Sequence, residues 1–195
     1  MRIISGTSGG IPLRVPKTVL RPTTDRTRSA VFSILADRVK GARVADLFAG
    51  SGAYGLECLS RGSKRAVFVD SDKAAIKTIE QNLAKAKLVA GGEVLQAKVD
   101  SWWTRPHPPF DIIFADPPYK KLEEDRDWNP EMLKSPFLLD LLAPGGLLMI
   151  ESWAHAREQA VPEAWDCVDD RKYGAARVRF FQKRVVEATE PEVTA

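Results

Sequence analysis

The sequence predicts an α/β fold: a doubly wound, mostly parallel sheet with helices on both faces. From residue 43 onward, short apolar segments alternate with longer segments of helical periodicity. This alternation is typical of a parallel sheet with helical crossovers. The short segments contain few polar residues, as strands buried on both faces do. The chain has 195 residues, of which 44% are hydrophobic, so one domain with a sizeable core is expected.

The expected elements follow from the period of the apolar residues. Strands are predicted at 43–48, 65–70, 93–100, 110–116 and 145–152. Helices are predicted at 53–62, 72–88 and 129–143, and a short one near 154–160. Residues 165–173 and 175–183 predict a terminal hairpin that turns near Gly174.

The chain before residue 43 predicts two further elements. Residues 1–20 predict a small β-hairpin extension, with GTSGG as its turn. Residues 21–39 predict a helix capped by Thr24 or Asp25. Its apolar residues fall on one face: Ala30, Val31, Ile34, Leu35 and Val39. We therefore divide the chain into the extension (1–20), the main domain (21–184) and an acidic tail (185–195) that we expect to be disordered.

Composition and charge exclude some classes of protein. The longest apolar run is shorter than the roughly 18 residues of a membrane span. Cys58 and Cys167 lie far apart, which argues against a disulfide framework and favours a reducing compartment, so the cytoplasm is expected. The net charge of +3 is small, but basic residues gather in 1–28. That segment is either a solvated basic face or a surface that meets phosphates.

The first predicted strand leads into a glycine-rich loop. Gly50, Gly52 and Gly55 form a G-x-G-x-x-G pattern between a strand and a helix, which lets a ligand approach the backbone closely. Asp70 closes the next strand, 20 residues past Gly50. Its carboxylate can accept both hydroxyls of a ribose. The alternative is that Asp70 caps the helix that opens at Asp72.

Two further acids argue against a nicotinamide cofactor. Asp46 precedes the glycine loop closely, where it would repel a pyrophosphate but suit a cationic ligand. Asp100, expected at the end of the third strand, either accepts a hydrogen bond from an adenine amine or lies in a solvated turn. Three acids at three strand ends predict a pocket for a nucleoside with a positive tail, such as S-adenosylmethionine.

The fourth predicted strand ends in Asp116, Pro117, Pro118 and Tyr119, here called the DPPY motif. Asp116 and the carbonyl of Pro117 can each accept one N–H of a planar amine. That arrangement aims the nitrogen lone pair at a methyl donor, so the gain is positioning and electrostatics. Tyr119 offers a face on which a base can stack. The target base would have to leave its own stack to reach the motif.

These motifs resemble those of a known family. DLFAGSGAYGLECLSRG and FDIIFADPPY are similar to class I S-adenosylmethionine-dependent amino-methyltransferases. MRIISG, LRPTTDRTRSAVFSIL and RKYG narrow the resemblance to the RsmD-type 16S ribosomal RNA guanine-N2 methyltransferases, over about residues 1–184. The resemblance implies a Rossmann-like sheet of seven strands with the last antiparallel. It also implies methylation of a guanine 2-amino group in 16S rRNA, on the assembled or assembling small subunit.

The resemblance assigns roles to individual residues. It implies cofactor contacts by Asp46, Ala49, Gly50, Ser51, Gly52, Asp70, Asp100 and Asp116. The catalytic residues are expected to be Asp116, Pro117 and Tyr119. RNA is expected to meet Arg2, Arg14, Arg21 and Arg26. We expect a monomer without a metal, because His107 and His155 have no partners at metal-ligand spacing.

Some features leave alternatives open. The hairpin tip, GTSGG, lacks the basic residues common in the family, which weakens the case for RNA contact there. The loop after the DPPY motif is either a lid or a solvated insertion. An adenine-N6 methyltransferase acting on DNA or RNA would share the DPPY motif. A nicotinamide-dependent oxidoreductase and a non-catalytic RNA-binding module are the other hypotheses.

Overall fold

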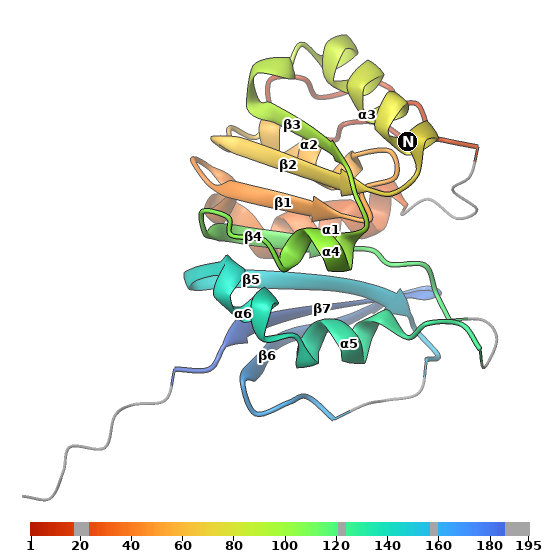
Figure 1. Cartoon of the computed structure of the whole chain (residues 1–195). Helices are drawn as coiled ribbons and strands as arrows, with labels where there is room; N and C mark the ends of the chain where they lie inside the picture. The colour runs from red at the N-terminus through yellow and green to blue at the C-terminus, as the bar shows by residue number, and fades with distance from the viewer. Residues whose placement is uncertain (18–23, 121–123, 157–159, 186–195) are drawn as a thin grey trace, which may run out of the picture.

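The computed structural model contains a central seven-stranded sheet (Figure 1). The structure describes residues 1–17, 24–120, 124–156 and 160–185. The strands are β1 (Arg43–Leu47), β2 (Arg65–Asp70), β3 (Gly92–Gln96), β4 (Phe110–Ala115), β5 (Leu142–Trp153), β6 (Trp165–Tyr173) and β7 (Ala176–Lys183). Their order is β3-β2-β1-β4-β5-β7-β6, and β7 is antiparallel to both of its neighbours. The other pairs are parallel, so the predicted sheet with an antiparallel last strand is confirmed.

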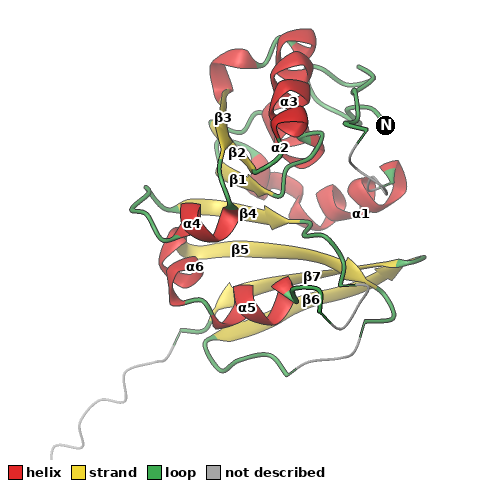
Figure 2. Cartoon of the chain, turned by 45° about the vertical axis from the view of Figure 1, so that its right-hand side comes forward, coloured by secondary structure: helices red, strands yellow, loops and turns green. Residues whose placement is uncertain are grey.

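Helices cover both faces of the sheet, as the alternating pattern predicts (Figure 2). On one face lie α1 (Asp25–Leu35), α2 (Ala53–Ser60) and α3 (Lys73–Ala86), and on the other lie α4 (Val99–Trp103), α5 (Trp128–Lys134) and α6 (Pro136–Leu141). Two 3-10 turns, η1 (Ala36–Val39) and η2 (Val89–Gly91), complete the described helical segments. The buried apolar residues form one cluster on each face. Along β5, Met149 belongs to the first cluster and Ile150 to the second, as alternation along a strand requires.

Helix α1 begins where the sequence indicates. Thr24 is its N-cap, and the Thr24 side chain accepts a hydrogen bond from the Thr27 amide. Val31 and Leu35 are buried on the predicted apolar face. Arg28 lies on the same side of the helix and is fully buried, which the charge pattern does not predict.

Several predicted boundaries are wrong. The predicted strand 93–100 ends at Gln96, and Val99 begins α4. Val99, Trp102 and Trp103 of this helix bury their side chains in the second cluster. Their spacing suits one face of a helix. The predicted helix 129–143 is two helices, because Pro136 disfavours helical geometry at Ser135, which is extended. Residues 154–156 form a turn, not the start of the expected short helix.

Residues 1–17 form a short, hairpin-like segment, here called the N-terminal segment. Arg2 and Pro12 form one antiparallel bridge, and the Ile3 amide donates to the Ile11 carbonyl at 3.0 Å. The wide turn between them leaves little chain for strands. Gly6 and Gly10 in this turn have φ of 84° and 85°, values that glycine adopts easily. The outcome is a hairpin without regular strands.

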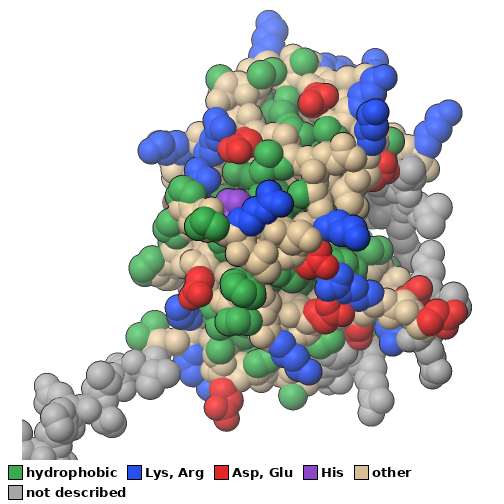
Figure 3. Space-filling view, viewed as in Figure 1, with side chains coloured by type: hydrophobic (Ala, Val, Ile, Leu, Met, Phe, Trp, Pro, Cys, Tyr) green, Lys and Arg blue, Asp and Glu red, His purple; other side chains and the backbone are tan. Residues whose placement is uncertain are grey.

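No described helix is both long and apolar enough to span a bilayer. On the face shown in Figure 3, acidic and basic side chains are interspersed, without a large area of one sign. The predicted acidic tail lies outside the described residues beyond Val185.

Candidate active site

The carboxyl ends of β1, β2 and β4 bring most of the predicted site residues to one edge of the sheet. The arrowheads of β1, β2 and β5 point to this edge (Figure 1). Leu47 of β1 is in register with Val69 of β2 and with Ala115 of β4. The glycine loop, Asp70 and Asp116 therefore follow three adjacent strand positions. This juxtaposition is the one that the sequence predicts for a ligand site.

The glycine loop adopts a conformation that favours glycine. Gly50 and Gly52 have φ of 53° and 75°, and Gly52 is the N-cap of α2. Gly55 is required for packing, since a Cβ atom there would lie 2.3 Å from Cε1 of Phe68. Helix α2 can thus approach β2 closely. In the loop itself, Gly50 is partly exposed, whereas Ser51 and Gly52 are buried.

Asp46 lies beneath this loop. Its side chain is buried, and Oδ2 accepts a hydrogen bond from the Gly55 amide at 2.9 Å. Burial raises the pKa of Asp46 to about 7, against the lowering effect of the Gly55 hydrogen bond. This hydrogen bond therefore connects the first turn of α2 to β1. Contact between Asp46 and a cationic ligand stays a prediction.

Asp70 binds the same loop from β2. Its Oδ2 accepts the Gly50 amide at 2.8 Å, and Oδ1 accepts the Asp72 amide at 2.9 Å. Asp72, not Asp70, caps α3, because the Asp72 side chain accepts the Ala74 amide. The capping alternative for Asp70 is therefore wrong. Each carboxylate oxygen keeps a further lone pair, so Asp70 can still accept ribose hydroxyls.

Asp100 is not at a strand end. It lies in the first turn of α4, and its Oδ2 is 2.6 Å from Nη1 of Arg126. This hydrogen bond lowers the pKa of Asp100. Arg126 also pairs with Glu131 and lies 3.7 Å from the ring centroid of Trp128. The strand-end position predicted for Asp100 is wrong, and its contact with a cofactor stays a prediction.

The DPPY motif directly follows β4. Asp116 and Tyr119 are partly exposed, Pro117 is buried and Pro118 is exposed. The Tyr119 hydroxyl donates to Oε1 of Glu151 at 3.4 Å. A partly exposed aromatic ring next to a carboxylate suits a stacked, amine-bearing base.

Two residues near the motif were missed by sequence reasoning. Glu151 is 3% exposed in β5, and its Oε2 accepts the Tyr54 hydroxyl at 2.9 Å. The Tyr54 ring stacks on Phe114, with centroids 4.9 Å apart. The signal was present for Glu151, because this acid lies near the end of an apolar strand as Asp46, Asp70 and Asp116 do.

Of the predicted RNA-binding arginines, three are described and exposed: Arg2, Arg14 and Arg26. Arg2 lies 3.7 Å from Asp25, and Nη1 of Arg14 donates to Gln81 at 2.8 Å. Arg21 lies outside the described residues. These side chains stay candidates for contact with phosphates.

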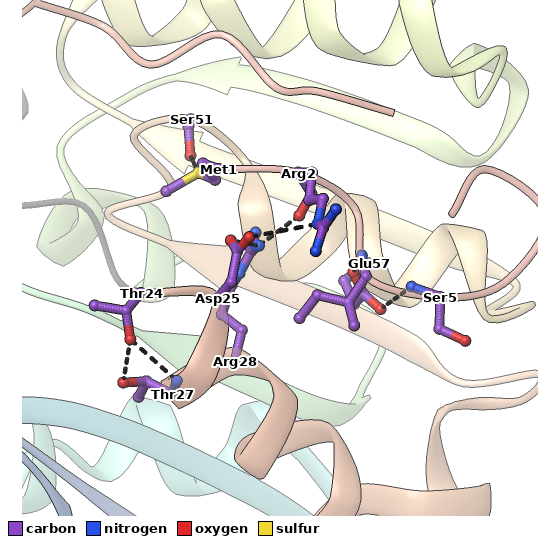
Figure 4. A network of polar contacts seen from close by, with 10 residues as sticks. Met1, Arg2, Ser5, Thr24, Asp25, Thr27, Arg28, Ser51 and Glu57 are labelled. Carbon is purple, nitrogen blue, oxygen red and sulfur yellow. Dashed lines mark hydrogen bonds and ion pairs between the residues drawn. The ribbon is translucent and has the colours of Figure 1, made fainter. Parts of the chain in front are cut away.

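Arg28 joins α1 to the N-terminal segment (Figure 4). Its Nη2 donates to the Arg2 carbonyl and to Oδ1 of Asp25, and Figure 4 shows these groups converging. The Ser51 hydroxyl of the glycine loop also donates to the sulfur of Met1. The N-terminal segment is therefore attached to the helix before β1 and to the loop after it.

No described cluster of three or more His, Cys, Asp or Glu residues could hold a metal ion. Cys58 is buried in α2, and burial raises the pKa of its thiol. Trp102 and Trp103 are both buried, so packing accounts for both side chains.

Comparison with known proteins identifies the family. The model of the family described as Conserved hypothetical protein 95 matches residues 1–182. The chain belongs to this family. The Conserved hypothetical protein 95 match covers the N-terminal segment and the sheet except for the last residue of β7. A relative named ribosomal RNA small subunit methyltransferase D confirms the resemblance to RsmD-type methyltransferases.

Two curated relatives of this chain are named as ribosomal RNA methyltransferases. The chain is 35% identical to the putative rRNA methyltransferase YlbH of Bacillus subtilis, over 94% of this chain and 100% of that protein. It is 33% identical to ribosomal RNA small subunit methyltransferase D of Escherichia coli, over 94% of this chain and 90% of that protein. A solved structure of the putative methyltransferase yhhF from Escherichia coli superposes with a TM-score of 0.80. It is 34% identical, and the match covers 94% of this chain and 97% of that one.

Proposed function

We propose that this protein transfers a methyl group from S-adenosylmethionine to the exocyclic 2-amino group of a guanine in small-subunit ribosomal RNA. The proposed substrate is 16S rRNA in the assembled or assembling subunit, and the proposed setting is the cytoplasm, with the enzyme acting as a monomer. Of the relatives that match nearly the whole chain, one is named a small subunit ribosomal RNA methyltransferase and another a putative rRNA methyltransferase.

One observation carries the proposal. The DPPY motif and the glycine loop follow β4 and β1, which are adjacent strands, with Ala115 paired to Leu47. An amine bound at Asp116 would then lie beside a ligand bound at the loop. This proximity is what direct transfer of a methyl group between two bound molecules needs.

The residues of the loop fit the proposed cofactor. Gly50 is partly exposed and has no side chain that would keep a ligand away, and Asp70 has carboxylate lone pairs for a ribose. The buried Asp46 and the nearby Asp116 favour a cationic ligand at this edge over a pyrophosphate. When bound, S-adenosylmethionine supplies an electrophilic methyl group. Ala49 and Ser51 are further candidates for contacts, being part of the same loop.

The chain's contribution to the reaction is orientation. Asp116 and the Pro117 carbonyl would each accept one N–H of the guanine 2-amino group. Its lone pair, otherwise delocalised into the base, would then point toward the cofactor. The Tyr119 ring would bind the extruded base by stacking, worth about 1–3 kcal/mol. The exposed Arg2, Arg14 and Arg26 would bind RNA phosphates.

Product analysis tests the proposal. The protein is incubated with labelled S-adenosylmethionine and small subunits that lack the methyl group, and the RNA is digested to nucleosides. We expect the label in N2-methylguanosine. Label in N6-methyladenosine would instead support the adenine-N6 alternative, and no label in any nucleoside of naked or assembled rRNA would refute methyl transfer to RNA.

Asp116→Ala tests the catalytic assignment. We expect at least a hundredfold loss of methyl transfer, by analogy with the roughly 100- to 1000-fold cost of removing a hydrogen-bonding group that acts in the transition state. Asp140→Ala, which removes an exposed carboxylate in α6, is the matched control and should retain full activity. Thermal unfolding should show both variants folded. Full activity of Asp116→Ala would contradict the assigned role.

A further inference from the structure

The buried carboxylate of Glu151 lies between the two loops of the candidate site, and the reaction proposed above does not use it. Glu151 is near the carboxyl end of β5, which pairs with β4. Ile150 is in register with Ala115, so Glu151 lies beside the strand position of Asp116. The Glu151 side chain is on the sheet face covered by α1 and α2. Met149, two residues earlier in the strand, belongs to the first cluster, and alternate residues of a strand face the same side.

Glu151 accepts hydrogen bonds from one tyrosine of each loop. Oε2 accepts the hydroxyl of Tyr54, in the first turn of α2 after the glycine loop, at 2.9 Å. Oε1 accepts the hydroxyl of Tyr119, in the DPPY motif, at 3.4 Å. One carboxylate thus connects the proposed cofactor loop with the proposed base-stacking residue, although the two tyrosines are far apart in sequence.

The two ends of this connection differ in burial and in hydrogen-bond length. Tyr54 is 4% exposed and stacks on Phe114 with an interplanar angle of 11°, so its position is fixed by packing. Burial and then Glu151 raise the pKa of the Tyr54 hydroxyl well above its ordinary value, which keeps it a donor. Tyr119 is partly exposed, and its bond to Glu151 is longer than the usual 2.5–3.0 Å of an O–H···O bond.

We propose that Glu151 is a positioning residue that orients the Tyr119 ring for stacking of the target base. The inference rests on the function proposed above. Tyr54 fixes the carboxylate, the carboxylate fixes the Tyr119 hydroxyl, and the ring then presents its face beside Asp116. The long Tyr119–Glu151 bond shortens when the base arrives, as catalytic hydrogen bonds often do in the substrate complex. Glu151 acts through Tyr119 and needs no contact with the base.

Tyr119→Phe separates this role from stacking alone. The substitution keeps the ring and removes only the hydroxyl that Glu151 binds. We expect kcat/KM for small subunits to fall about tenfold, the effect of losing a hydrogen bond to a charged group. The Kd for S-adenosylhomocysteine should stay unchanged, because the cofactor loop is untouched. Wild-type activity in Tyr119→Phe would overturn the inference.

A double-mutant cycle tests whether Glu151 acts through Tyr119. Glu151→Ala should lower kcat/KM about as much as Tyr119→Phe, and the double variant should be no worse than the more impaired single variant. Losses that multiply would overturn the inference, since the residues would then act independently. If Glu151→Ala does not fold, Glu151→Gln replaces it, with a smaller loss expected because one acceptor oxygen remains. Glu163→Ala removes an exposed glutamate and is the control.

The cycle also separates failure of this inference from failure of the proposed function. Wild-type protein that forms no N2-methylguanosine under any condition would refute the proposed function, and the cycle could not then be measured. Wild-type protein that forms it, with both single variants unimpaired, would refute the role of Glu151 alone.

Discussion

At the scale of single residues, Asp46 and Asp70 accept hydrogen bonds from the glycine loop and its helix, and the same acids are proposed to contact the ligand. Asp46 and Asp70 accept amides of Gly55 and Gly50, so both carboxylates fix the glycine loop through bonds within the protein. A carboxylate can accept about four hydrogen bonds, which makes structural and ligand-binding roles compatible. The loop is therefore preorganised by the same residues that would contact the cofactor.

Asp46 should make stability depend on pH. Its pKa in the folded protein is about 7, against an ordinary value of 3.8, with burial as the main cause. The folded state therefore binds this proton more tightly than the unfolded chain does. The stabilisation is complete below about pH 4 and is lost as the pH rises through 7.

Asp46→Asn, which stays neutral and keeps an acceptor for Gly55, removes this dependence. We expect the free energy of unfolding of the variant to rise relative to wild type by up to about 1.4 kcal/mol per pH unit between roughly pH 4 and 7. Urea unfolding of both proteins at pH 5, 6, 7 and 8, without cofactor, measures the difference. A difference that does not change with pH would show that Asp46 titrates normally.

Sequence reasoning identified the site residues that depend on local pattern and missed those that depend on packing. Asp46, Asp70 and Asp116 follow from strand ends, which apolar runs mark clearly. The helix that contains Asp100 was missed because a short amphipathic turn follows a strand without a glycine or proline between them. Glu151 shares the strand-end pattern, but its contact with Tyr54, 97 residues away, is one that no local pattern reveals.

At the scale of elements, the packing of α2 on β2 depends on the absence of a side chain at Gly55. A Cβ atom there would lie 2.3 Å from Cε1 and 2.7 Å from Cζ of Phe68. Phe68 is fully buried in the first cluster, so its ring has little room to move. The third glycine of the loop pattern therefore serves helix–strand packing, the role that it has in dinucleotide-binding βαβ units.

Gly55→Ala should destabilise the protein by about 1–3 kcal/mol, the usual cost of overpacking a core. Denaturant unfolding measures the loss. The matched variant is Gly55→Ala/Phe68→Leu, in which the smaller side chain removes the clash. The double variant should lose less than the sum of the two single losses. Additive losses would mean that the ring of Phe68 does not oppose a side chain at residue 55.

The elements that the sequence predicts well are those in which the apolar period and the flanking turns agree. The strands β1, β2 and β4 and the helices α2 and α3 agree with the prediction to within about two residues, because apolar period and flanking turns coincide there. The segment 129–143 has a helical period throughout, yet Pro136 divides it into α5 and α6. The N-terminal hairpin lacks regular strands because its wide turn leaves little chain for them, although Arg2 and Pro12 still form an antiparallel bridge.

At the scale of the whole molecule, the N-terminal segment is part of the main core. Ile3 and Leu13 are buried in the first cluster. Glu57 of α2 is fully buried, and its carboxylate accepts the amides of Ile4 and Ser5 at 2.6 and 3.0 Å. Burial of two such apolar side chains contributes about 3–6 kcal/mol, so the segment adds appreciably to stability.

The segment is also connected to the glycine loop. Asn82 of α3 accepts the Arg14 amide at 2.8 Å and donates both to the Arg14 carbonyl and to the Ser51 carbonyl, each at 2.9 Å. The backbone of the segment is thus bound to the proposed cofactor loop. The side chains of Arg2 and Arg14 are exposed, which leaves them available to RNA. Attachment therefore uses the backbone, and RNA binding would use the side chains.

Because the backbone attaches the segment and the arginine side chains would bind RNA, stability and RNA binding should respond to different substitutions. Glu57→Gln replaces one carboxylate oxygen by an NH2 group, which cannot accept a hydrogen bond from a backbone amide. We expect the free energy of unfolding to fall by about 2–4 kcal/mol, because buried donors lose a charged acceptor. The double variant Arg2→Ala/Arg14→Ala keeps every backbone hydrogen bond and should change stability by less than about 0.5 kcal/mol.

RNA binding should show the opposite response. For Arg2→Ala/Arg14→Ala, we expect weaker binding of small-subunit rRNA and a logarithmic salt dependence that is shallower by about 1 for each phosphate that the variant no longer neutralises. Urea unfolding and binding titrations at several salt concentrations measure the two properties on the same samples. If the arginine variant bound RNA with an unchanged affinity and salt slope, the N-terminal segment would contribute packing alone, and the RNA would have to bind elsewhere along the carboxyl edge of the sheet.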